Sequence, residues 1–177
     1  MTTLLGDFDV AGFWKQSKYA TKEYVEAPLT PALLERVERT LGYTLPAAYV
    51  ELMQHQNGGI PQRTCHRTAE PTSWAEDHIA ITGIYGIGET KRCSLCGGFG
   101  SKFWQAEWGY PDIGVYFADC PSAGHDMLCL DYRASGPTGE PRVVHVDQGR
   151  DYAITVVAPT FESFIRGLVS EEDLNEE

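Results

Sequence analysis

The sequence predicts an α+β fold in which helices pack on an antiparallel or mixed sheet of about five or six strands. Two amphipathic segments with helix-capping signals lie before residue 60, whereas alternating apolar residues dominate residues 113–158. A further helical stripe follows at residues 160–168. The chain has 177 residues and no repeat or interior linker, so we expect a single domain over residues 1–177, with an N-terminal lid at 1–28 and an acidic tail at 171–177.

Composition and charge narrow the class of protein. The hydrophobic fraction of 42% is typical of a globular chain, and 14 basic against 25 acidic residues give a net charge of −11. Five of the acids lie in the last seven residues, but the remaining body is still acidic. Such a surface repels phosphate backbones, so we expect no nucleic-acid partner and favour a basic protein partner, although acidity also serves solubility.

The chain lacks the usual signals for export or membrane insertion. The first residues show no basic start before an apolar run, and no run approaches the roughly 20 apolar residues that a span requires. We therefore expect a cytoplasmic protein. The cysteine count is five, an odd number that favours reduced thiols over a disulfide framework.

The helical half begins with the lid, where Val10, Phe13 and Trp14 have helical spacing and predict a short helix that ends before Pro28. Thr30 and Pro31 predict the cap and first turn of the next helix, which Gly42 ends. A second helix is expected from Pro46 to the sequence Asn57-Gly58-Gly59, whose residues tolerate positive φ. The two helices form an αα corner.

The strand half follows a long loop at residues 60–77. Ile79, Ile81 and Gly83 predict one strand, and a glycine-rich, aromatic stretch at 85–111 contains a short helix capped by Ser101. Strands are expected near residues 113–117, 128–132, 143–147 and 154–156. The last three follow each other through turns of hairpin length and predict an antiparallel meander. Thr160 caps the closing helix.

Several blocks of the chain resemble the SUKH superfamily, which includes fungal cell-wall assembly regulators of the Smi/Knr type and many bacterial immunity proteins. The first block comprises Glu38, Leu41-Gly42, Leu45-Pro46, Tyr49 and Asn57-Gly58-Gly59. The later blocks are PTSWAEDHIAITGIYGIG, EWGYPDIGVY, CPSAGHDMLCLDYR, GEPRVVHVDQ and FESFIRGL, so the resemblance extends over residues 13–169. It implies an α+β fold and a role in binding and neutralising toxin effectors, often nucleases or deaminases. It carries over no catalytic motif.

Two sets of residues have the composition of a chemical site. Cys93 and Cys96 form one CxxC pair, but tetrahedral zinc needs four ligands and the chain has no second pair, so separate thiols are favoured and no metal or cofactor is expected. The second set holds histidines and carboxylates, for which local hydrogen bonds at loop ends are favoured over a hydrolytic site. Its members are Asp119, His125, Asp126, Asp131, His145 and Asp147.

We therefore interpret the chain as a non-enzymatic protein-binding module that resembles an immunity protein for a basic nuclease or deaminase. The candidate partner-binding residues are Trp74, Glu76, Asp77, His125 and Asp126. An aromatic anchor among acids suits a basic partner. The alternatives are a regulatory scaffold of the Smi/Knr type, or a metal protein or hydrolase that uses His125, Asp126, Cys93 and Cys96.

Overall fold

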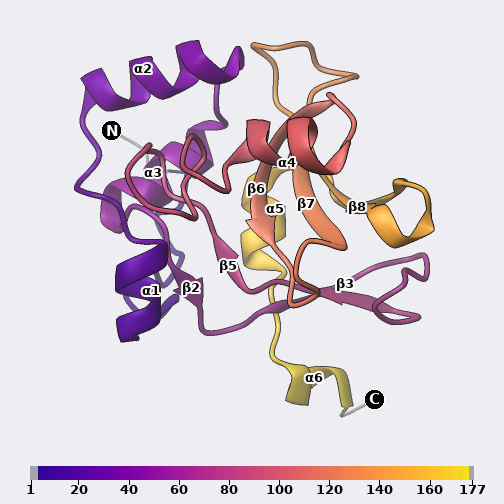
Figure 1. Cartoon of the computed structure of the whole chain (residues 1–177). Helices are drawn as coiled ribbons and strands as arrows, with labels where there is room; N and C mark the ends of the chain where they lie inside the picture. The colour runs from indigo at the N-terminus through magenta and orange to yellow at the C-terminus, as the bar shows by residue number, and fades with distance from the viewer. Residues whose placement is uncertain (1–3, 176–177) are drawn as a thin grey trace.

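A five-stranded antiparallel sheet forms the centre of the computed structural model, which describes residues 4–175 (Figure 1). Its strand order is β5-β6-β7-β8-β9, and consecutive strands pair as a meander. The strands are β5 (Gly83–Ile84), β6 (Gly114–Asp119), β7 (Asp126–Asp131), β8 (Arg142–Asp147) and β9 (Ala153–Ala158). Two small sheets pair β1 (Trp14–Lys15) with β2 (Ile60–Pro61) and β3 (Cys65–Arg67) with β4 (His78–Ala80). The predicted α+β class and the antiparallel meander are confirmed.

Helices cover the sheet. Helix α5 (Phe161–Arg166) packs against β8 and β9, α3 (Ala47–His55) packs against α5, and α4 (Ser101–Trp108) packs against β6. The residues of β7 are buried along its whole length, as expected for a strand with cover on both faces. Buried apolar residues of helices and sheet form one continuous core, in which the Tyr49 ring lies against Phe117 and Phe161. None of the described helices has the length and apolar character of a membrane span.

The αα corner has the predicted caps. Helix α2 (Pro31–Leu41) begins where the Thr30 hydroxyl accepts a hydrogen bond from the Leu33 amide at 3.1 Å. It ends at Gly42, whose φ of 84° lies in the left-handed region. Gly58 and Gly59 also have positive φ, as predicted, but Asn57 does not. Asn57 is instead a buried cross-link between three backbone groups, described below.

The prediction of a helix over Val10, Phe13 and Trp14 is wrong. These residues lie in turns and in β1, and the helix α1 (Lys18–Glu23) begins later, where the Ser17 hydroxyl caps it. Phe13 and Trp14 are nevertheless buried, because their rings pack on each other and on the body. Helical spacing of apolar residues therefore identified the buried side chains but not the backbone that carries them. The helix also ends at Glu23, well before Pro28.

Three further details differ from the prediction. The 60–77 loop contains β2 and β3, and the expected strand through Ile79 and Gly83 is divided between β4 and β5, which belong to different sheets. Gly100, not Ser101, caps α4, because the Ser101 hydroxyl accepts a hydrogen bond from the Tyr116 amide of β6. The expected solvated tail forms helix α6 (Glu171–Asn175), while residues 176–177 lie outside the described part.

Candidate functional site

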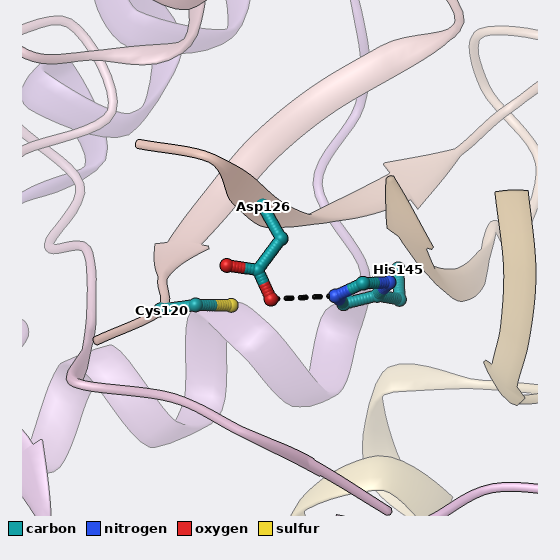
Figure 2. Close-up of side chains that lie close together, drawn as sticks. All are labelled: Cys120, Asp126 and His145. Atoms are coloured by element: carbon teal, nitrogen blue, oxygen red, sulfur yellow. Dashed lines mark hydrogen bonds and ion pairs between the residues drawn. The ribbon is translucent and has the colours of Figure 1, made fainter. Parts of the chain in front are cut away.

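A thiol, a carboxylate and an imidazole meet at one end of the central sheet (Figure 2). Cys120 follows β6 directly, Asp126 begins β7, and His145 lies on β8 diagonally across from Asp126. The meander register therefore brings together residues from three segments of the chain. The Nε2 atom of His145 lies 2.7 Å from the Asp126 carboxylate. All three residues are at most 3% exposed, and His145 is fully buried.

The electrostatics of this cluster favour a protonated thiol and an ionised carboxylate. Burial alone would raise the pKa of Asp126, but hydrogen bonds from His145 and Ser122 hold it below its ordinary value. Burial and the neighbouring carboxylates of Asp126 and Asp119 raise the pKa of the Cys120 thiol well above its ordinary value. A thiol nucleophile needs the thiolate form, so Cys120 is poorly suited to that role.

The donor atoms of the cluster lie within 4.8 Å of one another, which is close enough for a shared metal ion. However, zinc sites take four ligands, and the Asp126 carboxylate is already engaged by His145 and Ser122. The His145 Nδ1 atom has no hydrogen-bond partner in the described part of the chain, so the ring bonds through Nε2 alone. We interpret the cluster as a buried hydrogen-bond network. Asp126 thus bonds the side chains of His145 and Ser122.

Apart from Asp126, the residues named for a metal protein or hydrolase, His125, Cys93 and Cys96, do not belong to this cluster. His125 is exposed on the loop before β7, where its Nδ1 atom lies 3.1 Å from the Gln148 side chain and its ring meets Trp108 edge-on. Within residues 4–175, neither Cys93 nor Cys96 belongs to a group of three potential ligands. Burial raises the pKa of Cys93 to about 12 and that of Cys96 to about 11, so both are neutral thiols near pH 7.

The predicted surface residues on the β3–β4 loop are all exposed. Trp74 is 43% exposed, and Glu76 and Asp77 follow it on the same loop. Ser73 anchors the loop to the end of β8, because its amide and hydroxyl both donate to the Asp147 carboxylate, at 3.0 and 2.8 Å. His125 contacts the next residue after Asp147, so the Trp74 and His125 loops flank the same β8–β9 turn.

An aromatic cleft of about 380 Å³ lies beside the buried cluster and shares Cys120 with it. Its walls are the six rings of Tyr19, Tyr85, Phe99, Phe103, Trp104 and Trp108. The carboxylates of Glu23 and Asp119 also line it. Trp108 connects the cleft to the His125 loop. The sequence pattern showed the aromatic stretch at 85–111 but not the cleft, because Tyr19, Glu23 and Asp119 come from distant segments.

The sequence profile of the SMI1 / KNR4 family (SUKH-1) matches residues 28–167. The chain belongs to this family. No individual curated protein is significantly similar to it. The suspected relationship to the SUKH superfamily is thereby confirmed, and the sheet, the buried cluster and the Trp74 loop all fall inside the matched SUKH region.

One wall of the aromatic cleft lies outside the matched SUKH region. Helix α1 supplies Tyr19 and Glu23, and both precede residue 28. The segment is fixed to the 85–100 loop by Glu26, whose carboxylate accepts hydrogen bonds from Thr90, Lys91 and Ser94 at 2.6–2.8 Å. Residues that precede the family match therefore complete the cleft.

Asn57 fixes the same loop from the SUKH side. Its amide nitrogen donates to the carbonyls of Ala27 and Ile87 at 3.0 and 2.9 Å, and its oxygen accepts from the Ile87 amide at 2.7 Å. Asn57, which the sequence suggested only as the end of a helix, thus connects the lid segment to the loop that carries Tyr85 and Phe99. The walls of the cleft are held by buried hydrogen bonds.

Proposed function

We propose that the chain is a non-enzymatic protein-binding module that neutralises a basic effector protein, as the immunity members of its superfamily do. The single observation that carries this proposal is the exposed Trp74 on a loop fixed to the sheet. Tryptophan is among the residues that most often dominate binding energy at protein interfaces. Membership of the SMI1 / KNR4 family supports a binding role without identifying the partner.

The Trp74 loop is held in place before any partner binds. Thr72 and Ala75 close a turn through a 2.9 Å backbone hydrogen bond, and the Trp74 amide donates to the Thr72 hydroxyl at 3.1 Å. Ser73 is bonded to Asp147, and Arg150 donates to the Pro71 carbonyl at 3.3 Å. A fixed loop loses little conformational entropy on binding, so more of the interaction energy contributes to affinity.

The charges suit a basic partner. Glu76 and Asp77 are exposed beside Trp74, and the whole chain carries a net charge of −11. Nucleases and deaminases that act on nucleic acids present basic surfaces to the phosphate backbone. An acidic surface attracts such a protein and accelerates association. We propose that this neutralisation takes place in the cytoplasm.

The alternatives have less support in the structure. An enzymatic role for Cys120 conflicts with the raised pKa of its thiol. A regulatory scaffold of the Smi/Knr type would use a similar binding surface, and the identity of the partner separates it from an immunity protein. Protection from a toxic gene product is the property that a scaffold does not share.

The test is co-expression with the product of the neighbouring gene in the native host, followed by a binding measurement on the purified pair. We expect protection, and Trp74→Ala should weaken binding by about tenfold or more, or about 1.4 kcal/mol. Val156→Ala is the matched control, because Val156 is an exposed apolar residue on β9, 46% exposed, and should leave affinity unchanged. Protection that survives Trp74→Ala at full affinity would refute the role of this loop, and no protection would refute immunity.

A further inference from the structure

The aromatic cleft combines two features that together recognise a cation. Aromatic ring faces attract a guanidinium or ammonium group, and carboxylates form charge-assisted hydrogen bonds with it. Here six rings surround a hollow of about 380 Å³ into which Glu23 and Asp119 both open. The rings are fixed in place: Trp104 donates from its indole nitrogen to the Phe99 carbonyl at 2.8 Å and packs against Phe103 and Trp108.

Asp119 is a carboxylate of the cleft that has no cationic partner among the described residues. Tyr24 donates its hydroxyl hydrogen to both carboxylate oxygens, at 2.8 Å each, but Asp119 forms no ion pair with any residue between 4 and 175. Burial raises its pKa to about 6, although hydrogen bonds from Tyr24 and from the backbone at Asp119 and Gly83 act in the opposite direction. Buried charges in proteins are normally paired, so an unpaired carboxylate facing a cleft is a candidate for pairing with a ligand.

Arg92 shows that the cleft rim accommodates a guanidinium. Its guanidinium carbon lies 5.8 Å from the centre of the Phe99 ring, and its Nε atom lies 3.6 Å from the Glu23 carboxylate. The Arg92 side chain is 62% exposed, so this pair is weak and readily exchanged.

We propose that the aromatic cleft binds the side chain of an arginine, or of a lysine, that a basic partner protein inserts between the rings onto Asp119 and Glu23. Arginine is favoured, because its planar group stacks on aromatic rings and pairs with a carboxylate through two hydrogen bonds. The acidic charge of the chain is complementary to such a partner. This inference rests on the proposed function only in one respect, namely that a basic partner protein supplies the cation.

The test uses the full chain and a minimal probe, Nα-acetyl-arginine methylamide, followed by amide chemical shifts and tryptophan fluorescence. The citrulline analogue is the matched probe, since it has nearly the same shape without the charge. We expect the arginine probe to perturb residues of the cleft and to bind about tenfold more tightly than the citrulline probe. Equal binding of the two probes, or no binding in the millimolar range, would overturn the proposal.

Two isosteric variants distinguish binding in the cleft from attraction by the net negative charge of the chain. Asp119→Asn should weaken arginine binding by about tenfold, whereas Asp112→Asn, which removes an exposed charge outside the cleft, should change it less than twofold. If both variants lost affinity for arginine equally, the net charge would explain the binding, and the proposal would be overturned. Glu23→Gln gives a second test should Asp119→Asn perturb the fold. It should also weaken arginine binding, and unchanged affinity would overturn the proposal.

The outcomes also distinguish this inference from the proposed function. Binding of a basic effector that is insensitive to Asp119→Asn, with no probe binding, would overturn the cleft proposal and leave the Trp74 surface as the interface. Arginine binding in the cleft without a basic protein partner would support the cation site and count against neutralisation of an effector.

Discussion

Replacing Asp119 with asparagine is expected to stabilise the protein at neutral pH. Burial raises the pKa of this carboxyl from 3.8 to about 6, so the folded protein holds the proton more tightly than the unfolded chain does. The folded state therefore binds more protons between these two values, and the free energy of unfolding falls as the pH rises through them. A shift of about two pKa units corresponds to a loss of at most about 3 kcal/mol above pH 6. Asparagine carries no charge and avoids this loss.

The groups around Asp119 do not hide the pH dependence that its carboxyl group is expected to cause. The neighbouring phenols and thiols all have raised pKa values and stay neutral: Tyr19, Tyr24, Tyr85, Cys93 and Cys120. The nearby charges are those of Glu23 and Arg92, which pair with each other, and Asp126, whose pKa is lowered despite its burial. Asp119 is therefore the group of this set expected to titrate near pH 6.

The assay is urea-induced unfolding of the native protein and of Asp119→Asn between about pH 4 and about pH 7.5. We expect the two proteins to differ little at the acidic end and the variant to gain about 1–3 kcal/mol at the neutral end. Asp112→Asn, the exposed control, should stay within about 0.5 kcal/mol of the native protein throughout. A variant that is less stable at neutral pH, or a difference that does not change with pH, would refute the interpretation of Asp119 as an unpaired charge.

Two further substitutions test the polar contacts that hold the site. Asn57→Ala should destabilise by about 3 kcal/mol, because it leaves the buried amide and carbonyl of Ile87 without their partner; urea unfolding measures this, and a loss below about 1 kcal/mol would contradict it. Asp126→Ala should cost about 1–3 kcal/mol near pH 7, because it leaves the buried Nε2–H group of His145 without its acceptor. Its effect should shrink as the pH falls through the lowered pKa of Asp126, and a pH-independent loss would show that the carboxylate charge is unimportant.

Local signals in the sequence were sufficient for most of the fold. The helix caps at Thr30, Gly42 and Thr160 were predictable because each depends on one residue and its immediate neighbours. The meander was predictable because apolar residues alternate along its strands and turn residues separate them. The lid was misread because the spacing of Phe13 and Trp14 reports burial, and burial here arises from packing in turns and a two-residue strand.

The site was less predictable, for a physical reason. Trp74 and His125 were identified one at a time as exposed candidates, but their common attachment to the β8–β9 turn depends on contacts of Ser73 and Gln148 across the fold. Asp126 was expected at the binding surface, whereas it is 2% exposed and bonded to His145, so we assign it to the buried network. A carboxylate before a strand looks the same in sequence whether it faces a partner or a buried histidine.

The cleft was beyond local inference because its two acids belong to segments far apart in the chain. Asp119 lies within the region shared with the family, but Tyr24, which bonds to its carboxylate, precedes residue 28. The same preceding segment supplies Tyr19 and Glu23. Asp119, a carboxylate of the family region, thus receives the hydrogen bond from Tyr24 and two residues of its cleft from the segment that precedes the family match. If the cleft binds a cation of the partner, then the segment before residue 28 contributes to the choice of partner together with the SUKH domain, because it supplies Tyr19 and Glu23.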